Sequence, residues 1–350
     1  MNIFKKIIDA LHAEERVMLA TILNTAGSTP AAALAKMLLY NNGSSFIGTI
    51  GGGCMEGEVQ FLLQRWYEEN RAGIISYELN EDDVENGLIC GGNLEILIEP
   101  LTTKYIPLFE EIYTRRINGE DTILVTHLSA ENNNRTEKFI AHQHGDCSMR
   151  YANEILRALK KNETVQVHPD EGTFIFEPVA GTPHLYVFGG GHVSKFICRI
   201  AAMAGFRVTV IDDRMQYANS ERFPDAQNTI VADYAELAAH ISIQPTYYVV
   251  IVTRGHQFDE TILEQVLSTN AKYIGMIGST RKVLITFNHL LARGITREQL
   301  LRVYSPVGLE LGAVSAEEIA VSIVAELIRC RRGEGLPMRH KNTVLRELGF

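Results

Sequence analysis

Residues 185–214 read LYVFGGGHVSKFICRIAAMAGFRVTVIDDR, and this stretch decides the fold of the second half of the chain. A short apolar run is followed by the loop Gly189-Gly190-Gly191 and then by a helical pattern. A second apolar run ends at the acidic residues Asp212 and Asp213. Asp212 follows Gly191 by 21 positions. This spacing is typical of the βαβ unit that binds dinucleotides, with Ser194 standing where the third glycine usually occurs. We therefore predict a strand, a glycine loop and a helix here.

The same loop predicts an anion site. Its glycines would let backbone amides approach a phosphate, and a helix beginning at His192 would direct its N-terminal N–H groups at the anion. Asp212 or Asp213 would bond a ribose hydroxyl. The two acids would repel a 2′-phosphate, although Arg214 would offset this, so a nicotinamide ligand would be NAD rather than NADP. The alternative is a loop that only makes a tight turn.

The remainder of this half alternates apolar strands with helical segments. Such alternation predicts a doubly wound parallel sheet, hence a Rossmann-like domain over residues 181–350. The expected strands are 228–233, 247–254, 272–279 and 301–306, and the expected helices are 259–268, 279–294 and 315–331.

Two further strand ends carry candidate site residues. In an open α/β sheet, ligands bind at the carboxyl ends of the strands, so Arg254 and His256 are expected to face the crevice. The alternative for His256 is an ordinary surface histidine. Asp259 is expected to cap the following helix.

A second anion site is predicted at Gly278 and Ser279, where a glycine turn precedes a helix that Ser279 would cap. Arg281 and Lys282 fall in the first helical turn, where cations oppose the helix dipole unless an anion binds. A solvated basic face is the alternative for these two side chains.

The first half of the chain, residues 1–180, predicts a mixed α/β (α+β) domain. Strands and turns are expected before residue 54, a helix is expected from about Glu56 to Arg71, and a strand is expected to stop at Pro100. Two hairpins are expected over residues 122–146 and 164–179.

Two cysteines in this half lie beside glycines. Cys54 follows Gly51, Gly52 and Gly53, and Cys90 precedes two more glycines. A thiol just before a helix N-terminus is favoured as the thiolate, although Glu56 opposes this. Thiolates bind soft metals or transferred sulfur. The alternative is a small buried hydrophobe, which is the expected fate of Cys198 and Cys330.

Composition excludes several classes. The net charge of −9 argues against a nucleic-acid binder held by phosphate contacts. The odd count of five cysteines, without a signal sequence, argues for reduced thiols. The absence of a CxxC pair argues against structural zinc, and no protein metal site is expected. No apolar run reaches the roughly 18 residues of a membrane span, so a cytoplasmic protein without a membrane partner is expected.

Taken together, these stretches resemble the XdhC/CoxI family of molybdenum-cofactor maturation factors. The resemblance is carried by TAGSTP (25–30), IGTIGGGCMEGEV (47–59), CGGNLEILIEP (90–100), residues 186–214, ERFPDA (221–226), VVIVTRGHQFDE (249–260), YIGMIGSTRK (273–282) and SPVGLELGAVSAEEIAVSIVAELI (305–328). Residues 102–182 carry no matching motif.

The resemblance implies an accessory protein that binds the molybdenum cofactor, as molybdopterin or its nucleotide form, and supports its sulfuration. It implies delivery to a xanthine dehydrogenase-like molybdoenzyme, with a cysteine desulfurase as a further partner and a homodimeric state. The family's motif cysteines fall on Cys54 and Cys90, as contacts for sulfur or molybdenum, and any molybdenum is held through the cofactor.

Two other functions stay open. The fingerprint at Gly189–Ser194 with Asp212 also suits an NAD-dependent oxidoreductase. A nucleotidyltransferase acting on the pterin phosphate would use Arg281 and Lys282 to neutralise charge.

Overall fold

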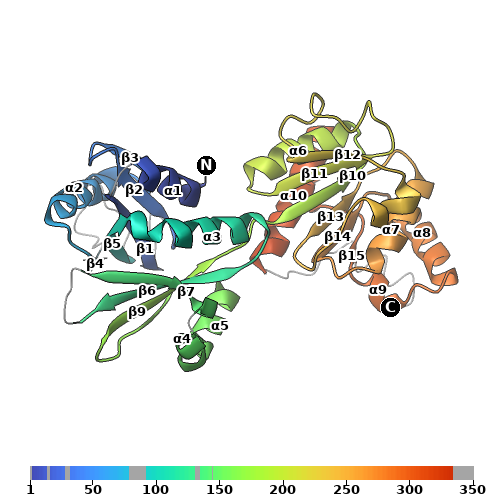
Figure 1. The fold of residues 1–350 in the computed structure, drawn as a ribbon. Helices are drawn as coiled ribbons and strands as arrows, with labels where there is room; N and C mark the ends of the chain where they lie inside the picture. The colour runs from blue at the N-terminus through green and yellow to red at the C-terminus, as the bar shows by residue number, and fades with distance from the viewer. Residues whose placement is uncertain are drawn as a thin grey trace. The chain divides into compact units, whose positions relative to one another are not determined.

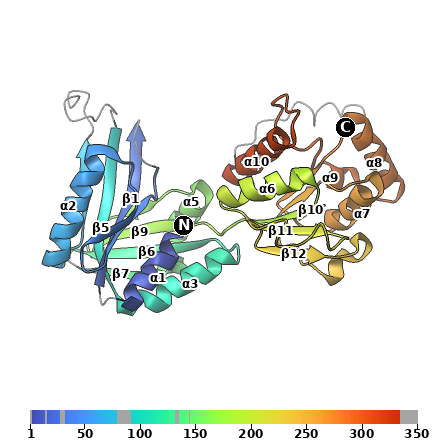
Figure 2. The same ribbon diagram turned by 90° about the horizontal axis from the view of Figure 1, so that it is seen from above.

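The structure is a computed structural model that describes residues 2–13, 16–27, 32–78, 92–130, 135–143 and 145–333. The chain divides into two compact units, Met1–Gly181 and Thr182–Phe350, here called the N-terminal and the C-terminal unit. Both are drawn in Figure 1 and, from above, in Figure 2. Within the described residues, no helix is both long and apolar enough to cross a membrane.

The C-terminal unit is built on a sheet of six parallel strands. These are β10 (His184–Phe188), β11 (Arg207–Asp212), β12 (Asn228–Val231), β13 (Tyr248–Ile251), β14 (Tyr273–Met276) and β15 (Val303–Tyr304). They neighbour one another in the order β12-β11-β10-β13-β14-β15. Counted along the unit this is the 3-2-1-4-5-6 order of a doubly wound nucleotide-binding sheet. The Rossmann-like fold predicted for this half is confirmed.

Helices cover both faces of this sheet (Figure 1). They are α6 (His192–Met203), η4 (Tyr234–Ala239), α7 (His256–Leu267), α8 (Thr280–Ala292), α9 (Arg297–Leu300) and α10 (Ala316–Arg332). Apolar side chains of α6 and α10 pack on one face, among them Ile197 and Ile323. Those of η4, α7, α8 and α9 pack on the other, among them Leu263 and Phe287. Helix α10 begins with a capping box formed by Ser315 and Glu318.

The N-terminal unit contains two antiparallel sheets. The first sheet has the order β3-β2-β1-β5-β4 and the second the order β7-β6-β9-β8. The strands are β1 (Arg16–Gly27), β2 (Lys36–Tyr40), β3 (Ser45–Gly48), β4 (Gly73–Glu78), β5 (Gly92–Thr102), β6 (Thr122–Ser129), β7 (Thr136–Ile140), β8 (Val165–Val167) and β9 (Gly172–Val179). The two predicted hairpins are confirmed as the pairs β6–β7 and β8–β9.

Helices pack on these two sheets in three places. The apolar residues of α2 pack on one face of the first sheet, and those of α4 and α5 on the second. Leucines and isoleucines of α1 and α3 share a cluster with both sheets. The helices are α1 (Ile3–Ala13), α2 (Gly53–Glu69), α3 (Ile106–Ile117), α4 (Gly145–Arg150) and α5 (Ala152–Lys161), with short turns η2 (Thr103–Tyr105) and η3 (Ala141–Gln143). This α+β arrangement confirms the predicted class.

Two predicted boundaries in this unit are wrong. Strand β5 does not stop at Pro100 but continues to Thr102, with Pro100 opposite Met18 of β1. The pairing of β4 with β5 ends at Ile98, so Pro100 has a strand neighbour on one side alone, where a missing N–H is tolerated. Helix α2 begins at Gly53, and Cys54 therefore lies within its first turn rather than before it.

Candidate functional site

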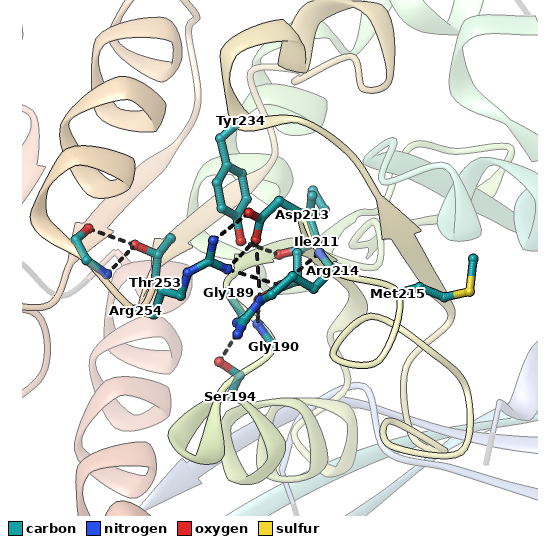
Figure 3. Close-up of polar contacts among 12 residues, drawn as sticks. Gly189, Gly190, Ser194, Ile211, Asp213, Arg214, Met215, Tyr234, Thr253 and Arg254 are labelled. Carbon is teal, nitrogen blue, oxygen red and sulfur yellow. Dashed lines mark hydrogen bonds and ion pairs between the residues drawn. The ribbon is translucent and has the colours of Figure 1, made fainter.

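The carboxyl ends of the parallel strands gather most of the predicted residues at one edge of the sheet. Gly189-Gly190-Gly191 follow β10, Asp213 follows β11, Arg254 lies beyond β13, and Gly278-Ser279 lie beyond β14. Because β10 and β13 are neighbours and the chain leaves them in opposite directions along the sheet, the glycine loop sits at the topological switch point. Figure 3 shows this edge.

Two glycines of the loop are required by the fold itself. Gly189 has φ +101°, and a Cβ there would lie 2.5 Å from the carbonyl oxygen of Val252. Gly190 has no room either, since its Cβ would lie 2.3 Å from the carbonyl oxygen of Tyr217. These two positions hold the loop between the segments that follow β13 and β11.

Gly191 differs from its two neighbours. It is the N-cap of α6 with φ −72° and ψ −167°, a conformation open to any residue. A Cβ built on Gly191 meets no atom of the described residues within 4 Å. Neither backbone conformation nor packing therefore explains why this position is glycine. The N–H groups of the first turn of α6 are directed to this open side, as an anion site requires.

Asp212 is tied to the loop rather than exposed to a ligand. It is 2% exposed, and its carboxylate accepts hydrogen bonds from the N–H of Gly190 at 2.8 Å and from Nε of Arg214 at 2.9 Å. The backbone N–H of Arg214 also donates to it, at 3.1 Å. These contacts give Asp212 a role in shaping the loop, and its bond to a ribose stays a prediction.

An ion pair connects the ends of β11 and β13, which flank β10. Arg254 donates two parallel hydrogen bonds, of 2.6 and 2.7 Å, to the two carboxylate oxygens of Asp213 (Figure 3). The Arg254 hydrogen bonds lower the pKa of Asp213, and Asp213 in turn raises the pKa of Arg254. The Arg254 guanidinium also lies 4.6 Å from the ring centroid of Phe258. Both side chains are thus present at the edge as predicted, and they bind each other.

Asp259 does not cap α7 as predicted. It is fully buried, and its carboxylate accepts from the N–H of Thr253 at 3.2 Å and from the Thr253 hydroxyl at 2.6 Å. Lys282 donates to the same carboxylate. The carboxylate thereby fixes the segment that leads to Arg254. It also engages Lys282, one of the two cations that a nucleotidyltransferase would use.

The second predicted anion site has the expected cap. Ser279 is the N-cap of α8, and its hydroxyl accepts from the N–H of Lys282. Arg281 is exposed and makes no ion pair or hydrogen bond with the part of the chain that the structure describes. Gly278 is closely approached by the Lys282 side chain, 3.0 Å from a built Cβ.

Two predicted histidines begin helices at this edge. His192 is the first residue of α6, is exposed, and stands edge-to-face on Phe196 with 5.3 Å between ring centroids. His256 is the first residue of α7, and its side chain lies outside the description. Their ligand roles stay predictions.

The glycine-flanked cysteine of the N-terminal unit sits on a loop of unusual backbone. Gly51, Gly52 and Gly53 have φ of +122°, +79° and +69°. This conformation, rather than access alone, requires glycine at three consecutive positions. Glu56 closes the turn, because its carboxylate accepts from the N–H of Gly52 at 3.0 Å and from the Thr49 hydroxyl.

The cysteines themselves are only partly placed. Cys54 is the second residue of α2, and its side chain lies outside the description, as does Cys90 altogether. Among the residues that are described, no group of three His, Cys, Asp or Glu side chains could hold a metal ion. Cys198 is buried, as predicted, and burial raises its pKa to about 12.

Comparison with known proteins identifies the family. Residues 185–327 match the XdhC Rossmann domain, and residues 10–78 match the XdhC and CoxI family. The chain belongs to the XdhC and CoxI family. A protein of Bacillus subtilis (strain 168), named as a probable subunit of xanthine dehydrogenase, is 29% identical over 341 residues, which are 95% of this chain and 98% of that protein.

Two other similarities agree with this assignment. A solved structure from Bacillus halodurans, described as a xanthine dehydrogenase, has a TM-score of 0.77 at 25% identity and covers 95% of this chain and 96% of that chain. YqeB of Escherichia coli (strain K12) is 30% identical over 176 residues, which are 48% of this chain and 32% of YqeB.

Within the XdhC Rossmann match, sequence reasoning missed the role of Arg222 and the contacts that Arg214 and Ser194 make. Arg222 donates to the carbonyl oxygen of Gly190 at 2.9 Å, and its guanidinium lies 5.0 Å from the ring centroid of Tyr217. Arg214 stacks on the same ring at 3.6 Å. The Ser194 hydroxyl donates to the Gly189 carbonyl. Arg222 therefore contacts the glycine loop directly and Arg214 contacts it through Asp212, while the predicted Arg254 pairs with Asp213 at the same strand ends.

Proposed function

We propose that this XdhC and CoxI family protein is an accessory factor for a xanthine dehydrogenase-type molybdoenzyme. It binds the molybdenum cofactor, as molybdopterin or its nucleotide form, supports its sulfuration and delivers it to that enzyme. Family membership and the names of the relatives from Bacillus subtilis and Bacillus halodurans support the accessory role. A cysteine desulfurase as sulfur donor and a homodimeric state belong to the same proposal.

The observation that carries the proposal is the open side of Gly191. A glycine that neither φ nor packing demands, at the N-cap of a Rossmann helix, suits a ligand that approaches the backbone closely. The cofactor carries a phosphate, extended by a second phosphate and a nucleoside in its nucleotide form. Either would meet the N–H groups at the start of α6, with Arg222 and Arg214 nearby to balance charge.

The residues of the chain divide the work in the proposal. The loop after β10 and the first turn of α6 bind and orient the phosphate. Arg254 and Asp213 position one another beside the phosphate-binding loop. A ligand that extends from this loop towards β11 has to displace or bridge their ion pair. Cys54, on the first turn of α2, offers a thiolate to sulfur or to molybdenum, and Cys90 is the second candidate thiol. When bound, the cofactor supplies the molybdenum centre that the client enzyme uses.

A binding and transfer experiment tests the proposal. Full-length protein is mixed with released molybdenum cofactor, separated from free cofactor, and assayed for retained molybdenum and for reconstitution of a cofactor-free xanthine dehydrogenase. Gly191→Val places methyl groups where the phosphate would lie, and we expect affinity to fall at least about tenfold, the loss of one or two charge-assisted hydrogen bonds. Met203→Val, at the exposed opposite end of α6, is the control.

The thiol is tested in the same assay. Cys54→Ala is expected to keep binding the cofactor through its phosphate. It should lose the reconstitution of enzyme activity that depends on sulfuration. Equal behaviour of wild type, Gly191→Val and Cys54→Ala would overturn the proposal.

An NAD-dependent oxidoreductase is the second candidate, favoured by the 3-2-1-4-5-6 strand order and by the two acids at the carboxyl end of β11. Titration with NADH, followed by its fluorescence, separates the two functions. Saturable binding that Gly191→Val abolishes would favour the dinucleotide, while absent binding removes this candidate.

A further inference from the structure

A cavity of about 310 Å³ lies in the N-terminal unit. Its size falls at the lower end of the range for small-molecule sites. Its walls come from α1, β2, the end of β3, the end of α3, the residue after α5, and β9. The residues that line it are Ile3, Phe4, Leu34, Lys36, Gly48, Arg116, Asn162, Glu177, Pro178, Val179 and Ala180.

A buried ion pair forms part of this lining. Nζ of Lys36 lies 2.7 Å from Oε1 of Glu177, and the two side chains are 6% and 7% exposed. Lys36 also donates to the hydroxyl of Thr21 at 3.1 Å. Burial lowers the pKa of Lys36, against the opposing effect of Glu177. The pair is neutral as a whole, so it adds no net charge to the cavity.

Arg116 adds a cation that no acidic side chain of the described residues pairs with. Its guanidinium lies 5.9 Å from the ring centroid of Phe4, and it forms no ion pair or hydrogen bond with a side chain of the described residues. Burial lowers the pKa of Arg116, yet a guanidinium stays charged at any physiological pH. A partly desolvated cation without a counter-ion is costly, and an anion in the cavity would remove that cost.

Backbone strain is concentrated on the same wall. Leu34 has φ +69°, a left-handed conformation that bulky residues avoid. Its N–H donates to the carbonyl of Ile22 at 2.9 Å, which holds it there. Strained residues of this kind occur preferentially beside ligands. Asn162, the C-cap of α5, also lines the cavity and has a positive φ of 52°.

We propose that this cavity binds a small organic anion, with its carboxylate or phosphate on Arg116 and its apolar part against Phe4, Leu34 and Val179. An arginine fork matches both of these anionic groups with two parallel hydrogen bonds. The Lys36–Glu177 pair forms a polar but neutral wall beside it, and Asn162 can donate to the ligand's remaining oxygen. This site is separate from the Gly191 loop of the proposed function, and its existence does not depend on that function.

Calorimetric titration of the full-length protein at low ionic strength tests the site with three probes of similar shape. Benzoate presents a carboxylate, phenyl phosphate a phosphate, and benzyl alcohol neither. We expect saturable binding of at least one anionic probe and none of benzyl alcohol. Arg116→Gln should weaken that binding at least about tenfold, because hydrogen bonds to a charged group are lost. Arg115→Gln is the matched control, since Arg115 on the same helix pairs with Glu111 and Glu120 instead.

Two further variants make the result decisive. Ala180→Phe fills the cavity from an exposed position while Arg116 stays in place, so it should also abolish binding even if Arg116→Gln is poorly folded. Gly191→Val should leave the affinity unchanged, which separates this site from the phosphate loop of the C-terminal unit. Absence of binding by both anions, or full affinity in Arg116→Gln or in Ala180→Phe, would overturn the inference. Loss in Gly191→Val alone would also overturn it, because the binding would then belong to the proposed cofactor site.

Discussion

Single glycines show how a repeated sequence feature can have different physical causes. Both GGG triplets predict loops that let a ligand approach. The structure assigns Gly51, Gly52 and Gly53 to positive φ, and it assigns Gly189 and Gly190 to close backbone contacts. Only Gly191 is left to the ligand. Sequence could predict the loop, its place between strand and helix, and the small residue at Ser194, but it could not tell which glycine does which task.

This difference between neighbours can be measured. Gly189→Ala combines a strained φ with a Cβ 2.5 Å from the Val252 carbonyl oxygen, so we expect it to lower the free energy of unfolding by about 3 kcal/mol. Gly191→Ala meets neither obstacle and should change it by less than about 0.5 kcal/mol. Urea unfolding followed by circular dichroism gives both values. Equal costs at the two positions would contradict the assignment of Gly191 to ligand approach.

A buried histidine makes the C-terminal unit sensitive to acid. Burial lowers the pKa of His184 from 6.5 to about 4, and its Nε2 lies 2.9 Å from the Thr209 hydroxyl. The unfolded chain therefore binds more protons than the folded chain between these two values, and stability falls as pH falls through this window. We expect a loss of about 2 kcal/mol between pH 7 and pH 5 from this group. His184→Gln, which cannot titrate, should lack that part of the pH dependence in urea unfolding at the two pH values.

At the scale of elements, the strand patterns did not predict that four charged side chains are buried as a layer between the two sheets of the N-terminal unit. Lys36, Glu99, Lys138 and Glu177 lie on strands β2, β5, β7 and β9 and are all buried. In a sequence, a charge on a strand indicates the solvent face. Here each charge is matched by a residue of the opposite sheet, far away in sequence. Helices and hairpins, which depend on local spacing, were predicted more accurately than this layer or the passage of β5 through Pro100.

The Lys138–Glu99 pair allows this layer to be tested. Nζ of Lys138 lies 2.7 Å from Oε1 of Glu99, both side chains are 1% exposed, and the glutamate oxygens receive no well-aligned hydrogen bond from the described residues. Lys138→Met leaves a buried carboxylate unpaired and should cost about 3–5 kcal/mol. The double variant Lys138→Met/Glu99→Leu should recover most of that loss, because neither charge remains. Chemical denaturation of the four members of the cycle measures the coupling.

An exposed pair supplies the comparison. Lys5 and Asp9 lie 2.9 Å apart on α1 with side chains about half exposed, so Lys5→Met should leave the urea midpoint nearly unchanged. If the double variant at Lys138 and Glu99 were as unstable as Lys138→Met alone, the loss would not come from an unpaired buried carboxylate. The two side chains would then stabilise the fold through their packing.

For the whole molecule, the sequence predicts the two halves with unequal success. The C-terminal parallel sheet can be predicted from the alternation of strands and helices along the sequence. Right-handed crossover connections then allow only a few strand orders. The N-terminal unit pairs β1 with β5, whose partners are separated by more than sixty residues, and no local pattern encodes such a pairing. Two halves with separate clusters of buried apolar residues are expected to unfold as separate cooperative units.

One tryptophan lets the units be followed separately. Trp66, the single tryptophan of the chain, lies 4% exposed on α2, so its fluorescence reports the N-terminal unit, while circular dichroism reports both. We expect Lys138→Met to move the fluorescence transition to lower urea. The part of the dichroism transition that comes from the C-terminal unit should stay in place. Gly189→Ala should leave the fluorescence transition in place and move the C-terminal part of the dichroism transition to lower urea. If either variant shifted both transitions by the same amount, the two units would unfold as one, and the stability assigned to each variant would belong to the whole chain.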